Sequence, residues 1–164
     1  MNTALKLAAV TLLCSAATLS LAESARSEKN MTLALANQLA TAAVSACQAN
    51  GYAVAATVVD RAGGIRAMQR ADNAGPHTIA ASERKAYTSA SAKNATTAMM
   101  EGAQKNPGSA NLVNIPGFLL LGGGMPVKVG NEVIGAVGVG GAPGGHLDDQ
   151  CVAAALESVK DQLK

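Results

Sequence analysis

The stretch MPVKVGNEVIGAVGV, residues 125–139, indicates two strands joined by a tight turn. Its central pair, Gly130-Asn131, consists of residues that accept the backbone of a two-residue hairpin. The flanking segments, 125–129 and 133–139, are rich in valine and isoleucine, which favour strands. We therefore expect an antiparallel hairpin here, followed by a glycine-rich loop over residues 140–145.

A second hairpin precedes this one in the chain. Residues 52–59 are apolar on both faces apart from Thr57, which is typical of a strand in the middle of a covered sheet. Residues 60–64 read as a turn, and residues 65–70 return as a strand. Residues 118–121 add one more predicted strand. The expected sheet therefore has about five strands and is mainly antiparallel.

Helices are predicted between and after these hairpins. Apolar periodicity indicates helices over residues 31–49, 78–93 and 97–104, and a last helix after Gly145. Asn50-Gly51 ends the first helix, and Asp148 and Asp149 in the first turn of the last one favour its dipole. The sequence therefore predicts an α+β fold, with helices on the faces of the sheet.

The first 22 residues have the pattern of an export signal. Lys6 precedes a mostly apolar run that extends to Ala22, and Ser20 and Ala22 are small residues at the positions that a signal peptidase reads. The run is also near the lower limit for a membrane anchor. We predict a signal peptide at 1–22, a flexible mature N-terminus at 23–30 and one domain at 31–164. The mature protein would be periplasmic or secreted, with no membrane attachment.

The charge of the chain bears on its possible partners, and its cysteines bear on the possibility of a disulfide. The formal net charge is +2, and no basic run is interleaved with aromatic residues, which excludes nucleic acid as an expected partner. Cys47 and Cys151 remain after signal cleavage, each in a predicted helix that faces the core. The sequence leaves open whether they form a disulfide, as an oxidising compartment allows, or stay as two buried thiols.

Two histidines and one carboxylate are candidates for chemistry. His77 follows Gly75-Pro76 and His146 follows two glycines, and a neutral imidazole can ligate iron or transfer a proton. Glu83 shares a helical face with apolar residues, so we expect it to point into apolar surroundings with a basic partner. Neither a nucleotide-binding loop nor a Ser-His-Asp arrangement is present.

These residues leave three functions open. The first is a small-molecule ligand-binding protein. The second is a small-molecule enzyme, in which Glu83 or His77 would transfer a proton on an organic acid and the amides of residues 140–145 would hold its anion. The third is an oligomeric interaction module without chemistry. Whether the chain is an enzyme is therefore not decided by the residues alone.

Five motifs together resemble one family. They are VVDRAGG at 58–64, RADNAGPHT at 70–78, RKAYT at 84–88, GGGMPV at 122–127 and IGAVGVGGAP at 134–143. Each is weak alone, but their order and distances are similar to those of the GlcG/HbpS family, the haem-binding or haem-degrading-like proteins that also occur as the C-terminal domain of PduO-type proteins. The resemblance covers residues 31–164.

The resemblance implies a profilin-like sandwich with a five-stranded antiparallel sheet, a homo-oligomer that is often an octamer, and binding of haem or a related tetrapyrrole. Carried over by motif, His77 is the candidate metal ligand, with Thr78 beside it, and Thr96 or Thr97 are alternative ligands. Lys85 would neutralise a haem propionate.

This chain departs from the family pattern at two points. Some exported members pair two acidic residues for iron, whereas here Ala80 stands three residues before Glu83. The chain also has only two tyrosines, one phenylalanine and no tryptophan, although pockets for flat ligands usually contain such side chains.

Overall fold

The two predicted hairpins join into one antiparallel sheet with the strand order β2-β1-β4-β3. The computed structural model describes residues 26–164, so the predicted signal peptide lies outside the described residues. The strands are β1 (Ala55–Asp60), β2 (Ile65–Arg70), β3 (Gly124–Val129) and β4 (Glu132–Gly140). β1 and β4 pair at the centre, which confirms the prediction that residues 52–59 supply a central strand.

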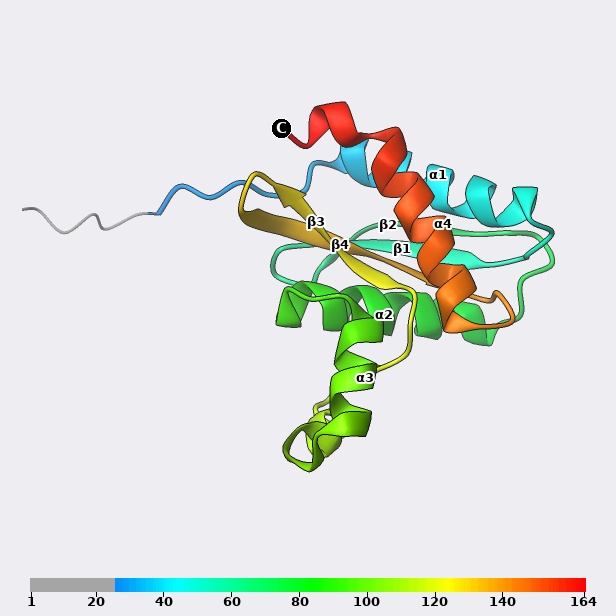
Figure 1. Cartoon of the computed structure of the whole chain (residues 1–164). Coiled ribbons are helices and arrows are strands. Elements are labelled where there is room, and N and C mark those ends of the chain that lie inside the picture. Colours follow the sequence, from blue (N-terminus) through cyan, green and yellow to red (C-terminus); the bar gives the residue numbers. More distant parts are fainter. Residues whose placement is uncertain (1–25) are drawn as a thin grey trace, which may run out of the picture.

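Four helices flank the sheet or extend from it. They are α1 (Leu33–Ala49), α2 (His77–Ala92), α3 (Thr96–Lys105) and α4 (Gly145–Ser158), and two short 3-10 helices are η1 (Pro107–Asn114) and η2 (Lys160–Gln162). α1 and α4 cover one face of the sheet and α2 covers the other, while α3 and η1 project away from the sheet on the side of α2 (Figure 1). Among the described residues, no helix has the length and apolar character needed to cross a membrane.

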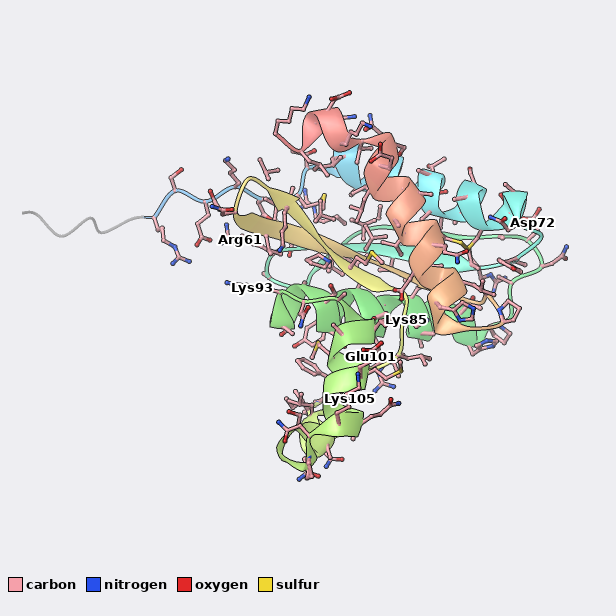
Figure 2. All side chains as sticks on the ribbon, in the orientation of Figure 1. Arg61, Asp72, Lys85, Lys93, Glu101 and Lys105 are labelled. Carbon is pink, nitrogen blue, oxygen red and sulfur yellow. A yellow bond between two sulfur atoms is a disulfide. The ribbon has the colours of Figure 1, made fainter. Side chains whose placement is uncertain are left out.

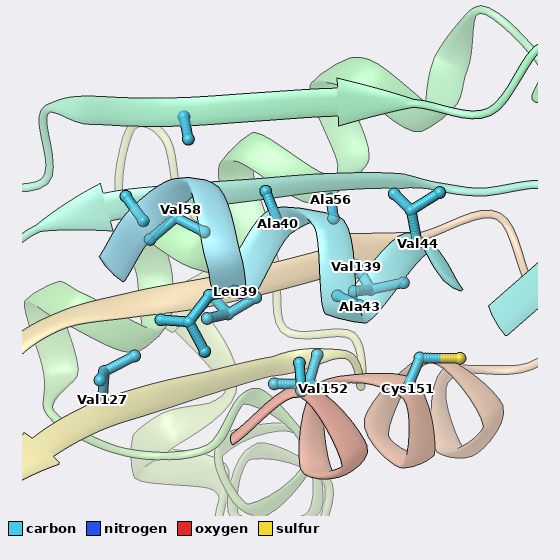
Figure 3. Close-up of a cluster of buried hydrophobic side chains, with 14 of the residues drawn as sticks. Leu39, Ala40, Ala43, Val44, Ala56, Val58, Val127, Val139, Cys151 and Val152 are labelled. Carbon is cyan, nitrogen blue, oxygen red and sulfur yellow. The ribbon is translucent and has the colours of Figure 1, made fainter. Parts of the chain in front are cut away.

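The larger part of the core lies between the sheet and the α1–α4 layer. Leu39 of α1, Val58 of β1 and Val152 of α4 are all fully buried there, and Figure 3 shows their side chains converging between the helices and the strands. Because the chain has so few aromatic residues, this core consists of alanine, valine, leucine, isoleucine and methionine packed with the two helical cysteines.

The described residues before α1, 26–32, form neither helix nor strand. Residues 26–32 are irregular, and the flexibility predicted for residues 23–30 stays a prediction. The Arg61 side chain donates to the Lys29 carbonyl over 2.7 Å. The Arg61 amide donates to the Asn30 side chain over 3.2 Å, so the end of the segment is attached to the β1–β2 turn.

The predicted strand at residues 118–121 is wrong. This segment is irregular, and the sheet has four strands rather than five. Its backbone groups bond to helix side chains instead of a neighbouring strand: the Leu119 amide donates to the Thr88 hydroxyl over 2.8 Å, and Arg84 donates to the Phe118 carbonyl over 2.5 Å. The apolar run that suggested a strand is therefore partly exposed, with Leu121 at 44%.

A disulfide joins α1 and α4, the two helices that cover the same face of the sheet. Cys47 near the end of α1 is bonded to Cys151 of α4, across a sequence separation of 104 residues. Both residues are buried, at 0% and 2% exposure. The bond decides between the two alternatives that the sequence left open.

Helix α2 lies unusually close to β4 because the strand has glycine where the helix crosses it. A β-carbon built on Gly138 would lie 2.1 Å from the Ser82 carbonyl oxygen and 2.5 Å from the Ala86 amide nitrogen. Both neighbours are helix backbone, which cannot move away locally. The spacing between α2 and the sheet therefore depends on Gly138.

Replacing Gly138 with alanine is expected to lower the free energy of unfolding by about 1–3 kcal/mol, because overpacking forces backbone shifts. Gly102→Ala in α3 is the matched control, since a β-carbon there meets nothing within 4 Å, and it should be neutral or stabilising by up to about 1 kcal/mol. Chemical denaturation of both variants measures the difference. Equal stability of the two would contradict this account of the helix–sheet contact.

Candidate functional site

His77 begins helix α2 and projects from the surface. It is exposed, and its ring lies next to Gly75, where an added β-carbon would be 2.8 Å from Cε1. His146 is also exposed in the first turn of α4 and has the same relation to Gly144. Each imidazole is thus exposed at the start of a helix and packs against the glycine two residues before it.

Thr78 is the neighbour of His77 but faces inward. Its exposure is 1%, and its hydroxyl donates to the Gly75 carbonyl over 2.7 Å. This bond closes the first turn of α2 on the preceding loop. The threonine therefore holds the loop that precedes His77, while the imidazole itself faces solvent.

Lys85 lies two turns further along α2, inside the protein (Figure 2). It is 1% exposed. Its Nζ donates to Oδ2 of Asp148 over 2.7 Å and to the Val139 carbonyl over 2.9 Å. The ammonium is thus engaged by a carboxylate from α4 and a carbonyl from β4. The predicted contact of Lys85 with a propionate would require this ion pair to open.

Burial and its partners act in opposite directions on the pKa of Asp148. Removal from water raises the pKa of this carboxyl above its usual value, and the nearby Asp149 adds to the rise. The hydrogen bond and the charge of Lys85 oppose the rise, as does the Ala142 amide, which donates to Asp148 Oδ1 over 3.0 Å. Burial is the largest of these effects.

Thr96 and Thr97, at the start of α3, bind the loop that precedes β3. The Thr96 hydroxyl accepts from the Gly124 amide over 2.9 Å. The Thr97 hydroxyl donates to Oδ2 of Asp149, whose Oδ1 accepts from the Gly123 amide over 2.7 Å. Both threonines are thereby engaged in bonds within the chain.

The glycines of this loop allow the polar groups to meet. A β-carbon on Gly123 would lie 2.9 Å from the Lys85 Nζ, and one on Gly124 would lie 2.5 Å from the Lys85 carbonyl oxygen. Gly122 packs against the backbone of Gly145 at the start of α4. We call this cluster, Lys85, Thr96, Thr97, Asp148 and Asp149 around residues 122–124, the polar junction.

The structure corrects the prediction for Glu83. This residue is exposed, whereas the buried face of α2 carries mostly small residues, among them Ser82 and Ala86. Ser82 on that face hydrogen bonds to Thr57 of β1 over 2.8 Å, whereas Ile79 and Tyr87 face outward at 37% and 36% exposure. Glu83 therefore needs no buried basic partner.

A surface cavity of about 310 Å³ lies next to Glu83. The Tyr87 ring is positioned between Gly63 of the β1–β2 turn and Gly117 after η1, each with a positive φ. Glu83 and Arg84 also line this cavity. A second cavity, of about 240 Å³, lies between α3 and η1 and is lined by Met100, Ala103, Gln104, Ala110, Val113 and Leu120.

The loop after β4 hydrogen bonds to a side chain of the same protein. The Ala142 amide already donates to the Asp148 carboxylate. The protein's own carboxylate therefore occupies the position that the enzyme hypothesis assigned to an organic acid. Among the described residues, no three histidine, cysteine, aspartate or glutamate side chains are grouped so that they could hold a metal ion.

Of the predicted site residues, Lys85, Thr96 and Thr97 meet at the polar junction. His77 and Thr78 lie at the start of α2, about two turns from Lys85. No sequence pattern indicates that Asp148 is the partner of Lys85, because 63 residues separate them. Arg84 was also overlooked as a candidate. It is the exposed cation next to Lys85, and the RKAYT motif contained both.

A family model and a protein of Escherichia coli are similar to this chain. The model for the family described as haem degrading protein HbpS-like matches residues 31–157. Protein GlcG of Escherichia coli K12 is 35% identical over 109 residues, which cover 64% of this chain and 80% of GlcG.

Solved structures with the same fold extend the comparison. A double mutant of HbpS from Streptomyces reticuli is 32% identical, with a TM-score of 0.79 over 96% of this chain and 99% of that one. A complex of PduOC with haem is 22% identical, with a TM-score of 0.70 over 79% of this chain and 94% of that one. At that identity, the likeness to PduOC concerns the fold alone.

Proposed function

Because this chain belongs to the family of HbpS-like haem degrading proteins, we propose that it binds haem or a related tetrapyrrole outside the cytoplasm. The description of the family supports the ligand class, since the family is named for the degradation of haem. The observation in this chain that carries the proposal is the exposed imidazole of His77, fixed at the start of α2.

The residues of α2 suit the chemistry of an iron tetrapyrrole. Imidazole nitrogen is a common protein ligand of haem iron, and among the predicted donors only His77 faces solvent, since Thr78 and Thr96 are buried and Thr97 bonds to Asp149. When bound, the tetrapyrrole would supply a redox-active iron. His77 would hold that iron.

Arg84 replaces Lys85 as the proposed partner of a propionate. It lies seven residues after His77 on the same helical face, about 10 Å along the axis, and it is exposed. Its guanidinium donates to the Phe118 carbonyl through Nη2, which leaves other N–H groups for a carboxylate. The exposed residue Ala80, which has a small side chain, lies between the two on this face.

A homo-oligomer forms part of the proposal. His77 does not line either of the cavities described above, so one protomer offers an open face to the macrocycle. A ligand of this size is usually mostly enclosed. A second copy of the chain would cover the other side of the ring.

The disulfide supports export. A buried bond between Cys47 and Cys151 forms and persists in oxidising compartments such as the periplasm or the extracellular space. The proposed signal peptide at residues 1–22 would direct the chain there. Mass spectrometry of the protein recovered from periplasmic and culture fractions tests both cleavage and location, and a mature chain that begins at Glu23 is the expected result.

Titration with haemin, followed by absorbance, tests the ligand and its proposed contact. We expect a shifted Soret band for the wild type and its loss for His77→Ala. His146→Ala is the matched control, since His146 is equally exposed and holds the same position relative to a glycine, and it should keep the shift. An unshifted wild-type band rules out the ligand, and an unchanged band in His77→Ala rules out the contact.

A further inference from the structure

The cavity next to Glu83 has charged and aromatic walls. It measures about 310 Å³ and is lined by Gly63, Glu83, Arg84, Tyr87, Pro116 and Gly117. These residues come from α2, from the β1–β2 turn and from the segment after η1. Sites for small molecules usually measure about 300–1,000 Å³, so this cavity lies at the small end of the range and suits a ligand much smaller than a tetrapyrrole.

The cavity has one negative and one positive side chain that do not pair with each other. Glu83 and Arg84 are consecutive residues of α2, and both are exposed. Among the described residues, neither forms an ion pair with the other or with any third side chain. Both charges are therefore available to a ligand that enters the cavity.

The guanidinium of Arg84 is held by the backbone next to the cavity. Its Nη2 donates to the Phe118 carbonyl over 2.5 Å, and Phe118 directly follows the cavity residue Gly117. A guanidinium has several N–H donors in a planar fork, so this one contact leaves others for the two oxygens of a carboxylate. Arg84 is thus a fixed cation that can bind a carboxylate.

The Tyr87 ring forms a rigid wall of the cavity. A β-carbon on Gly63 would lie 2.8 Å from Cδ2 on one edge of the ring, and one on Gly117 would lie 3.0 Å from Cε1 on the opposite edge. The backbone therefore holds the ring from both sides, which lowers the cost of ordering it when a ligand binds. The face of a tyrosine ring attracts an ammonium group, and Glu83, one helical turn before Tyr87, supplies the opposite charge.

We propose that this cavity binds a small zwitterion of the amino-acid type, with its carboxylate on Arg84 and its ammonium between Glu83 and the Tyr87 ring. A ligand with only one charge leaves the other charge of the cavity unmatched, so the two side chains together select the zwitterion. The inference goes beyond the proposed function, because it needs no tetrapyrrole. Since Arg84 is also the proposed partner of a propionate, the two ligands would compete for its guanidinium.

Isothermal titration calorimetry of the haemin-free protein with L-leucine, L-alanine and L-serine tests the proposal. Two truncated analogues of L-leucine separate its charges: isocaproate lacks the amine, and isoamylamine lacks the carboxylate. We expect saturable binding of the amino acids, and binding of each analogue about 10–100-fold weaker than that of L-leucine, because each lacks a hydrogen bond to a charged group. If none of the three amino acids binds, or if an analogue binds as tightly as L-leucine, the proposal is wrong.

Variants of the two charged residues locate the ligand. Glu83→Gln and Arg84→Gln should each weaken the binding of L-leucine about 10–100-fold. Glu101→Gln is the matched control, since Glu101 is an exposed glutamate of α3 that does not line the cavity, and it should bind as the wild type does.

Far-ultraviolet circular dichroism establishes that each variant is folded. Folded Glu83→Gln and Arg84→Gln proteins with the affinity of the control overturn the proposal, because the ligand would then bind elsewhere. Haemin titration of the wild type is scored separately. A protein that binds L-leucine but not haemin contradicts the proposed function alone, and one that binds haemin but no amino acid contradicts the cavity ligand alone.

Discussion

Replacing Cys47 and Cys151 together by alanine is expected to lower the free energy of unfolding by about 2–5 kcal/mol. The disulfide joins residues that are 104 positions apart, and a cross-link that closes a loop of this length restricts the unfolded chain by about 4–5 kcal/mol in the chain-entropy account. For a domain of this size the loss is a large part of its total stability.

Denaturant titration of three samples separates the cross-link from the packing of the sulfur atoms. Reduced wild-type protein keeps both buried sulfurs but lacks the bond, whereas the double alanine variant lacks both. We expect the reduced wild type to show most of the loss and the variant slightly more, because truncation leaves a small cavity. Oxidised and reduced protein of equal stability would contradict the cross-link's role.

Lys85→Met is expected to lower the free energy of unfolding by about 3–5 kcal/mol at neutral pH. It leaves the Asp148 carboxylate buried at 2% exposure without its cation, and an unpaired buried charge is costly. Lys105→Met is the matched control, because Lys105 pairs with Glu101 at the surface. An exposed pair of this kind contributes no more than about 1 kcal/mol.

The loss in Lys85→Met should grow with rising pH. Burial raises the pKa of Asp148, so its contribution to stability is fully present below the unfolded pKa and is lost as the pH rises through the folded pKa. Without Lys85, which opposes this rise, the loss is larger than in the wild type. Denaturation from pH 4 upward measures it, and a pH-independent difference would argue against this explanation.

The double variant Lys85→Met/Asp148→Asn should recover much of the stability, because neither buried charge remains. The asparagine oxygen can still accept from the Ala142 amide, which bonds to Asp148 Oδ1 in the wild type. A double variant that is as unstable as the single one would show that the bond geometry of the junction, rather than its charge, stabilises this contact.

Local patterns predicted most of the fold. The Gly130-Asn131 turn and the valine-rich strands beside it were predicted correctly, as were the four helices, because turns and periodic faces depend on neighbouring residues. The fifth strand at 118–121 failed since its apolar residues resemble a strand, while its backbone partners are side chains of a distant helix. Only the tertiary structure identifies those partners.

The site was harder to predict because its contacts are long-range. The expected inward direction of Glu83 was wrong because the buried face of α2 consists mostly of small residues, among them Ser82 and Ala86. These residues suit the close approach of the helix backbone to Gly138. The partner of Lys85 comes from another helix altogether. The RKAYT motif indicated that Lys85 is a candidate site residue, but not that it forms an ion pair with Asp148.

The position of the disulfide has a consequence for how the chain responds to proteases. The covalent ring from Cys47 to Cys151 encloses α3 and η1. Because η1 has no buried residue, it is the kind of exposed segment where proteolytic cleavage begins. A single cut there opens the ring without dividing the molecule, so both pieces remain tethered through the sulfur bridge. The nicked protein would separate into fragments only after reduction.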